Sequence, residues 1–196
     1  MKSKGFLRKK IKRLRDNLTA QARKTKSIKI RGFLYQDDAW KNACSVMIYY
    51  SCRSEVLTEE IIQHALTGSK EVLIPCVDAK NTRMIAVKIT DMTDIADRCA
   101  YGMLQPKKEL CTAYTGHIDL IIVPGIVFDT QGGRIGSGKG YFDAFLALHP
   151  HSCRIGLAYA CQVEKKIDQA AHDVRMHKII TEEGTVMIDH EKGGIQ

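Results

Sequence analysis

Five glycines lie within the nine residues from Gly132 to Gly140, with the basic residues Arg134 and Lys139 among them. Glycine allows positive φ angles and a close approach of the backbone, so successive N–H groups in such a segment can converge on an anion. Arg134 and Lys139 would add full positive charges. The segment therefore predicts a phosphate-binding loop, with a flexible or tightly turning surface loop as the simpler alternative.

The end of this segment distinguishes between classes of phosphate-binding loop. Residues 133–139 fit the G-x-x-x-x-G-K pattern, but Gly140 stands where a P-loop nucleotidase needs Ser or Thr to hold magnesium. The P-loop interpretation therefore fails at its metal ligand. Asp143 follows in the first turn of an expected helix. Its carboxylate could hold a magnesium ion bound to phosphate oxygens, or could simply interact favourably with the helix dipole.

The elements that must position this loop are short apolar runs separated by amphipathic stretches. We expect strands over 44–50, 71–76, 84–89, 118–123, 154–158, 178–181 and 185–188, and helices over 58–66, capped by Thr58, and 141–148. This alternation predicts an α/β fold, a single three-layer domain over residues 1–196 with a mainly parallel sheet covered by helices on both faces. The strand over 84–89 follows a short turn, so it is expected to be antiparallel to its predecessor.

Two basic helices are expected over residues 1–34, packed on this domain. Apolar residues at steps of three and four predict that the first helix buries Phe6, Leu7, Ile11, Leu14 and Leu18 and exposes Lys4, Arg8, Lys9, Lys12 and Arg15. Thr19 is expected to cap the second helix, which would run to about Leu34 with Ala22, Ile28 and either Phe33 or Leu34 inward.

The net charge of +8 is concentrated at this end of the chain. Residues 1–31 hold 13 lysines and arginines and one acid, whereas the rest holds 17 basic and 21 acidic residues. Such a segment can be a solvated helix face, a phosphate-binding arm or a nucleic-acid-binding patch.

Composition excludes several classes of protein. The apolar runs are far shorter than the roughly 18 residues that a membrane span needs, and the charged start lacks an apolar block, so a cytoplasmic location is expected. Seven cysteines with no C-x-x-C pair argue against a disulfide framework and a zinc knuckle. We expect them to be reduced and mostly buried. The 44% of hydrophobic and 27% of charged residues are typical of soluble globular proteins rather than disordered ones.

The run PGIVFDTQGGRIGSGKGYFDAFL resembles the R-L-G-x-G-x-G-Y-Y-D signature of 5-formyltetrahydrofolate cyclo-ligases. In the same order, LRKKIKRLRDNLT resembles the basic first helix of that family, SCRSEVLTEEII its substrate loop, AYGMLQP its aromatic-Gly…Pro turn, and HDVRMHKIIT its closing acidic motif. The matches span about residues 4–182. Three positions depart from the family pattern: Ala144 replaces an arginine, Phe142 a tyrosine, and Gln105 the acid before Pro106.

The resemblance implies an ATP- and magnesium-dependent conversion of 5-formyltetrahydrofolate to 5,10-methenyltetrahydrofolate, through a phosphorylated formyl group, with release of ADP and phosphate. ATP and the folate would be its small-molecule partners, and a monomer without nucleic-acid or membrane partners is expected. Two alternatives stay open. One is a nucleic-acid-binding module that uses the basic segment, and the other is a folate-binding relative that has lost turnover.

The resemblance also assigns residues. Lys4 and Arg8 would reach the ATP phosphates, Arg134 and Lys139 would act on the transferred phosphoryl group, and Asp143 and Asp173 would hold magnesium. The nucleotide loop would comprise Arg134, Ile135, Gly136, Ser137, Gly138, Lys139, Gly140, Tyr141 and Phe142, and the folate would contact Tyr50, Glu55, Ser137, Gly138, Lys139, Gly140 and Tyr141. Without the resemblance, some of these residues also have a simpler interpretation. Glu55 could be a surface charge, and Tyr141 could serve in core packing. His172 beside Asp173 could be a structural pair.

Overall fold

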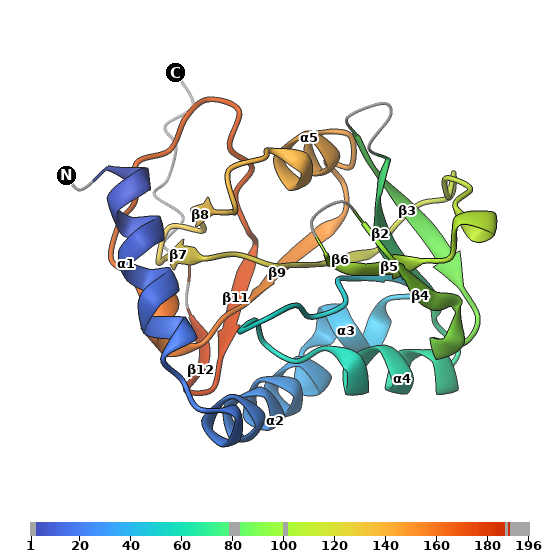
Figure 1. Cartoon of the computed structure of the whole chain (residues 1–196), viewed down its shortest axis with the longest axis horizontal. Helices are drawn as coiled ribbons and strands as arrows, with labels where there is room; N and C mark the ends of the chain where they lie inside the picture. Colours follow the sequence, from blue (N-terminus) through green and yellow to red (C-terminus); the bar gives the residue numbers. More distant parts are fainter. Residues whose placement is uncertain (1–2, 79–82, 100–101, 187, 189–196) are drawn as a thin grey trace.

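A seven-stranded sheet forms the centre of the computed structural model, which describes residues 3–78, 83–99, 102–186 and 188 (Figure 1). The strands lie in the order β12-β11-β9-β6-β1-β2-β3. Their bounds are β1 (Ser45–Ile48), β2 (Glu71–Asp78), β3 (Arg83–Ile89), β6 (Leu120–Val123), β9 (Cys153–Leu157), β11 (Lys178–Thr181) and β12 (Gly184–Val186).

The sheet is mainly parallel, as predicted. β11, β9, β6, β1 and β2 pair in parallel, whereas β3 pairs antiparallel with β2, and β12 with β11. From β1 the chain passes to β2 on one side and then to β6 on the other, so the direction of winding reverses between β1 and β6. In doubly wound sheets a crevice opens at this switch point, beyond the carboxyl ends of the strands. The loops that follow β1 and β6 therefore flank one crevice.

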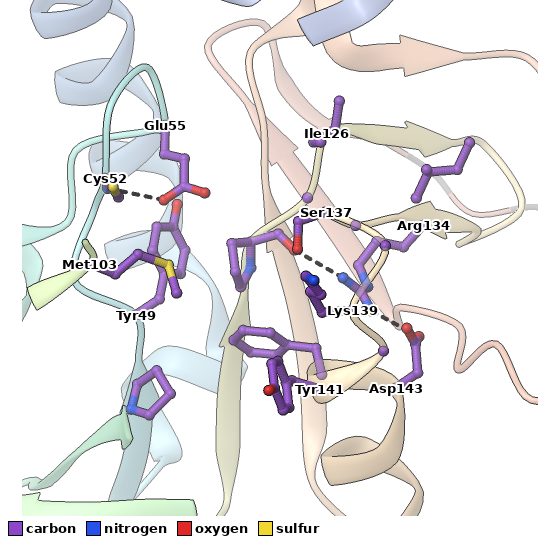
Figure 2. A pocket seen from close by; sticks show the side chains of 18 of the residues that line it. Tyr49, Cys52, Glu55, Met103, Ile126, Arg134, Ser137, Lys139, Tyr141 and Asp143 are labelled. Atoms are coloured by element: carbon purple, nitrogen blue, oxygen red, sulfur yellow. Dashed lines mark hydrogen bonds and ion pairs between the residues drawn. The ribbon is translucent and has the colours of Figure 1, made fainter. Parts of the chain in front are cut away.

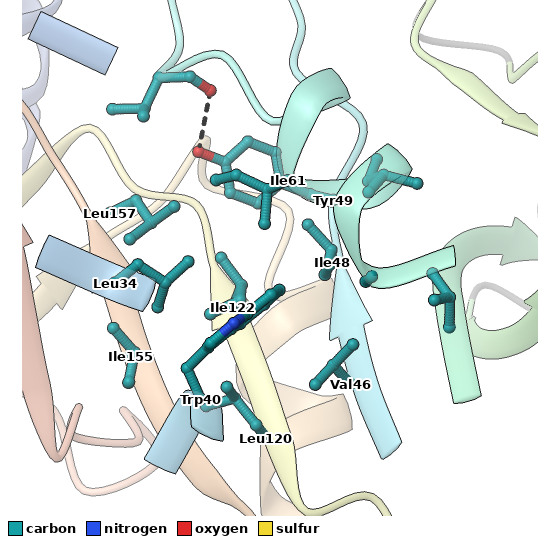
Figure 3. Packing of buried hydrophobic residues seen from close by; sticks show 14 of the residues in the cluster. Leu34, Trp40, Val46, Ile48, Tyr49, Ile61, Leu120, Ile122, Ile155 and Leu157 are labelled. Atoms are coloured by element: carbon teal, nitrogen blue, oxygen red, sulfur yellow. Dashed lines mark hydrogen bonds between the residues drawn. The ribbon is translucent and has the colours of Figure 1, made fainter. Parts of the chain in front are cut away.

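Helices and loops cover both faces of the sheet, which confirms the three layers. On one face lie α2 (Ala20–Gln36), α3 (Asp38–Asn42) and α4 (Glu59–Thr67). Figure 3 shows Leu34 and Trp40 from these helices packed over Val46 and Ile122 of the sheet. On the other face, Phe145 of α5 (Tyr141–Ala147) joins a cluster of the alternate strand residues Met47, Leu73, Ile121 and Ile179.

Shorter elements complete the fold. A small sheet has the order β10 (Val163–Glu164), β7 (Val127–Asp129) and β8 (Arg134–Ile135), and a second pairs β4 (Ile95–Arg98) with β5 (Leu104–Pro106). Three 3₁₀ turns are η1 (Met92–Asp94), η2 (Lys108–Leu110) and η3 (Ala160–Gln162). None of these elements was expected from the sequence. Leu7 and Ile11 of α1 (Lys4–Asp16) pack against Ile126, Val127, Ile135 and Ile167 at the first small sheet.

The inward face of α1 differs from the prediction. Leu7 and Ile11 are buried as expected, but Phe6 and Leu14 are 53% and 44% exposed, and Arg15 is only 5% exposed. The prediction was wrong for these three residues because α1 borders a large cavity as well as the apolar side of the first small sheet. Lys4, Arg8, Lys12 and Arg15, spaced by three or four residues, all line that cavity.

The second helix begins as predicted. Thr19 caps α2, since its hydroxyl accepts a hydrogen bond of 3.1 Å from the amide of Ala22. Ile30 and Leu34 are fully buried, but Ile28 is exposed, contrary to expectation. The stripe that meets the sheet is that of Ser27, Ile30 and Leu34, and Ile28 lies outside it.

Much of the basic charge of residues 1–31 is engaged within the fold. Besides the four cavity residues, Lys26 pairs with Glu182, Arg31 with Glu60, and Lys10 with Glu164 at 3.2 Å. The segment is therefore not a continuous free cationic surface.

All seven cysteines are free thiols. Only Cys76 is buried, Cys44 is exposed and the others are partly covered, so the expectation that most are buried was wrong. Cys52 and Cys99 line the cavity, whereas Cys153 and Cys161 pack against the edge of the core. No helix in the described part of the chain is long and apolar enough to cross a bilayer.

Candidate active site

A cavity of about 750 Å³ opens at the switch point, between the loop after β1 and the loop after β6 (Figure 2). This volume is typical of small-molecule sites. Figure 2 shows Cys52, Glu55 and Met103 on one side, facing Arg134 and Lys139 on the other. All the expected site residues line it: Lys4, Arg8, Tyr50, Glu55, Arg134, Ile135, Gly136, Ser137, Gly138, Lys139, Gly140, Tyr141, Phe142, Asp143 and Asp173. Their roles stay predictions.

The glycine loop is held in a defined conformation. Gly132, Gly138 and Gly140 have φ angles of 80°, 96° and 73°, which side chains rarely tolerate. The buried carboxylate of Asp129 accepts hydrogen bonds from the amides of Gly133 at 2.6 Å and Ile167 at 2.8 Å. A Cβ on Gly133 would lie 2.8 Å from that carboxylate, so a side chain is excluded there. This geometry disfavours the flexible-loop alternative.

Arg134 is buried beneath the loop. Its Nη2 donates to Asp143 Oδ1 at 2.8 Å, and its Nη1 donates to the carbonyl of Pro124 at 3.3 Å. Its guanidinium carbon lies 5.8 Å from the centre of the Phe142 ring. Within the described part of the chain, the Nε of Arg134 is buried without a hydrogen-bond partner. A buried donor without a partner costs about 1–3 kcal/mol.

Asp173 also lines the cavity and pairs with Lys4 of α1. Its Oδ2 also accepts from the amide of Ala170 at 2.7 Å. Burial by itself would raise the pKa of Asp173, but the hydrogen bonds from Lys4 and Ala170 outweigh it and hold the pKa below its usual value. His172 Nε2 is 3.8 Å from Asp173 Oδ1, beyond hydrogen-bond distance, and the ring is largely exposed. The pair has no general-base geometry.

The residues expected to hold magnesium share the cavity wall. Asp143 and Asp173 both line it, and each already pairs with a cation. The described residues contain no group of three or more His, Cys, Asp or Glu side chains that could hold a metal ion. Magnesium that arrives with phosphates needs only one or two protein carboxylates and keeps several waters. The donor set therefore fits a nucleotide-borne magnesium better than a structural metal.

Glu55 is carried by a tightly braced loop. Its Oε2 accepts from the amide of Cys52 at 3.0 Å. Burial raises the pKa of Glu55, opposed by that hydrogen bond and by the positive charges of Arg15 and Arg53. The hydroxyl of Thr58 donates to the carbonyl of Tyr49 at 2.6 Å. Thr58 precedes α4 as predicted but makes no side-chain cap, because its hydroxyl closes this loop instead.

Sequence reasoning missed most of the apolar wall. Pro75 and Val77 of β2, Met103, Leu104 of β5 and Tyr49 line the cavity opposite the glycine loop. The AYGMLQP segment was the one available signal, and its residues 100–101 lie outside the described part of the chain. Gln105, which replaces the usual acid, also lines the cavity, and its Oε1 accepts from the amide of Val77 at 3.3 Å.

These features define a doubly wound α/β protein in which a cationic glycine loop faces an apolar wall across the switch point. The sequence pattern of the 5-formyltetrahydrofolate cyclo-ligase family matches residues 1–182. A probable 5-formyltetrahydrofolate cyclo-ligase of Caenorhabditis elegans is 37% identical, over 72% of this chain and 74% of its own. The mouse 5-formyltetrahydrofolate cyclo-ligase is 28% identical, over 92% and 94%.

The fold agrees with these relatives. The solved structure of Aquifex aeolicus 5,10-methenyltetrahydrofolate synthetase superimposes with a TM-score of 0.82 and 26% identity, covering 98% of this chain and 96% of that one. A Mycoplasma pneumoniae synthetase shares the fold with a TM-score of 0.70, 21% identity and coverages of 92% and 99%. The chain belongs to the 5-formyltetrahydrofolate cyclo-ligase family and is thus an enzyme of the ligase class.

Proposed function

We propose that the chain catalyses the ATP- and magnesium-dependent cyclisation of 5-formyltetrahydrofolate to 5,10-methenyltetrahydrofolate, with release of ADP and phosphate. One observation carries the proposal. In a member of the cyclo-ligase family, the cationic glycine loop and the loop with Glu55 face each other across a single cavity that could hold both substrates.

The chemistry explains why both halves are needed. The formamide oxygen is a poor leaving group, so it first attacks the γ-phosphorus of ATP, and the bond from that phosphorus to the β–γ bridging oxygen breaks to release ADP. The N10 amine then attacks the activated formyl carbon and loses its proton, and phosphate departs with the former formyl oxygen. The reaction needs no nucleophile from the protein.

The protein's part is positioning and neutralisation of charge. Lys4, Arg8, Arg134 and Lys139 supply cations along the phosphate half of the cavity, and the backbone of residues 135–140 supplies N–H donors. Asp143 and Asp173 would hold magnesium, which supplies further neutralisation of phosphate charge when bound.

The folate half would use different groups, and Tyr50, Glu55 and Tyr141 line the cavity. Glu55 would accept hydrogen bonds from pterin N–H groups, while the rings of Tyr50 and Tyr141 would stack on the planar pterin. The single domain over residues 1–196, the monomeric state and the cytoplasmic location stay predictions.

A turnover assay tests the proposal directly. Purified protein with ATP, magnesium and 5-formyltetrahydrofolate should form methenyltetrahydrofolate, seen as its ultraviolet absorbance, and omission of ATP should abolish it. No product in the complete mixture would refute the proposed activity. If calorimetry then still detected folate binding, the chain would be a relative without turnover, whereas steeply salt-dependent binding of nucleic acid would favour the module interpretation.

Lys139→Ala is expected to impair the use of ATP more than the binding of folate. Removal of one charge-assisted phosphate contact should lower kcat/KM for ATP by roughly 10- to 150-fold. The affinity for 5-formyltetrahydrofolate, measured by calorimetry without nucleotide, should change less. Lys9→Ala is the matched control, because Lys9 is exposed on α1 and does not line the cavity. Unchanged ATP kinetics in Lys139→Ala would place the phosphates elsewhere.

Glu55→Gln is expected to stabilise the protein while weakening folate binding. Burial raises the pKa of Glu55, so ionising this carboxyl costs folding free energy. The wild type should therefore lose stability relative to the variant as the pH rises from acid to neutral. Thermal unfolding across this range measures the difference, and Glu183→Gln, at an exposed site, is the control. An equal pH dependence of Tm in wild type and Glu55→Gln would contradict the burial argument.

A further inference from the structure

Helix α1 contacts both loops that flank the cavity. Near its start, Arg8 Nε donates to the carbonyl of Gly136 in the glycine loop at 2.9 Å. Near its end, Arg15 Nε donates to the hydroxyl of Ser54 at 3.1 Å, and Arg15 Nη1 donates to the carbonyl of Gly125 at 3.2 Å. Ser54 follows β1 and Gly125 follows β6. One guanidinium therefore bridges the two sides of the switch point.

The carbonyl of Gly125, which accepts one end of this bridge, is also held in place by contacts that do not involve Arg15. The carbonyl of Gly125 also accepts from Nε2 of the buried Gln162 at 2.9 Å. A Cβ on Gly125 would collide with the ring of Phe128, so this backbone is closely packed. On the other side, the hydroxyl of Ser54 donates to Asp16, the neighbour of Arg15 on α1. Arg15 thus connects the loop between β1 and α4, here called the Ser54 loop, to the closely packed backbone at Gly125.

A cation in this position is costly if its purpose is only packing. Arg15 is 5% exposed, and its hydrogen bonds go to neutral acceptors, a hydroxyl and a carbonyl. The carboxylates of Asp16 and Glu55 compensate its charge only through space. Burying a charge without excellent compensation is often less stable than an apolar residue of similar volume. The fork of donors on arginine can reach two acceptors on separate loops at once, which an apolar residue cannot do. Its geometry matches a bridging role.

We propose that Arg15 is a positioning residue that sets the alignment of the two substrates by holding the Ser54 loop against the nucleotide side of the cavity. The inference rests on the proposed function, in which the formyl oxygen comes from the folate side and the γ-phosphate from the nucleotide side. A misplacement of about 1 Å between reacting atoms can cost about 100-fold in rate. Loss of the bridge should therefore affect the chemical step more than the binding of either substrate alone.

Arg15→Lys tests this by keeping the charge and removing the fork. We expect kcat to fall by about 10- to 100-fold, while KM for ATP and for the folate each change by less than about threefold. Arg13→Lys, on the exposed face of the same helix, is the matched control and should have wild-type kinetics. A normal kcat in Arg15→Lys, or a loss carried mainly by one KM, would overturn the proposal.

Ser54→Ala removes the other end of the bridge and provides a variant with a small volume change. If both residues act through one contact, the double variant should be little worse than Arg15→Lys alone, whereas independent roles would give additive losses. Additive losses would also overturn the bridge. Because Ser54→Ala removes only a hydroxyl, it keeps the test valid should Arg15→Lys fold poorly.

Hydrogen exchange of the unliganded protein gives a readout that does not depend on turnover. Arg15→Lys and Ser54→Ala should speed amide exchange in residues 52–57, and Arg13→Lys should not. Unchanged exchange in the first two variants would show that Arg15 does not hold this loop. Absence of product with the wild type would instead refute the proposed function, while the exchange result would still decide whether the bridge exists.

Discussion

Asp143→Asn is expected to lower turnover by about 100- to 1,000-fold at physiological magnesium, with little change in stability. An amide oxygen can still accept the hydrogen bond from Arg134 Nη2, so the local packing is kept. The substitution nevertheless removes the anionic oxygen that magnesium prefers. Turnover should recover in part when magnesium is raised or replaced by manganese, which accepts similar oxygen ligands.

The competing interpretation, in which Asp143 only pairs with Arg134 and the start of α5, predicts a loss of stability with activity nearly intact. Steady-state kinetics across a magnesium titration, together with urea unfolding, separate the two. Asp168→Asn, outside the cavity, is the control. Near-normal turnover and magnesium dependence in a folded Asp143→Asn protein would refute the metal role and leave Asp173 as the remaining candidate carboxylate.

Arg134→Met is expected to reduce both turnover and stability. The variant removes a buried cation from the phosphate half of the cavity, so kcat should fall by about 100- to 1,000-fold. It also leaves the partly buried carboxylate of Asp143 without its partner, which should cost about 1–3 kcal/mol of unfolding free energy.

A double variant separates these two effects. Adding Asp143→Asn to Arg134→Met removes the unpaired charge, so stability measured by urea unfolding should recover while turnover stays low. Arg175→Met, at a largely exposed arginine outside the cavity, controls for loss of a positive charge. The role of Arg134 in turnover is judged from the single variant, because Asp143→Asn by itself is expected to lower turnover. Near-normal kcat in a folded Arg134→Met protein would refute the action of Arg134 on the phosphoryl group.

The central sheet and the glycine loop could be predicted because their signals are local. Each parallel strand is a near-continuous apolar run, and the clustering of glycines with Arg134 and Lys139 is visible in nine residues. The short strands β7, β8 and β10 have two or three residues each, too few for a periodic pattern, and their pairing depends on contacts between distant segments.

The face of α1 illustrates a second limit. Helical periodicity identifies which residues share a face, but it treats every buried face as apolar. Arg15 is buried against acceptors on Ser54 and Gly125. Because these residues lie far along the chain from Arg15, no local sequence pattern could predict its burial. The wall built by Pro75, Val77 and Met103 was missed for the same reason, since ordinary apolar residues become a site only through the sheet topology.

The ion pair between Lys4 and Asp173 joins residues 169 positions apart. Protein synthesis proceeds from the N-terminus at about 5–20 residues per second, so the first helix made must wait roughly 10–30 seconds for its partner to emerge. During that interval Lys4 lacks its carboxylate partner, whereas Arg8 can already meet the carbonyl of Gly136. A ribosome-bound chain that stops before Asp173 therefore contains most of the cavity wall but not the ion pair that holds the start of α1.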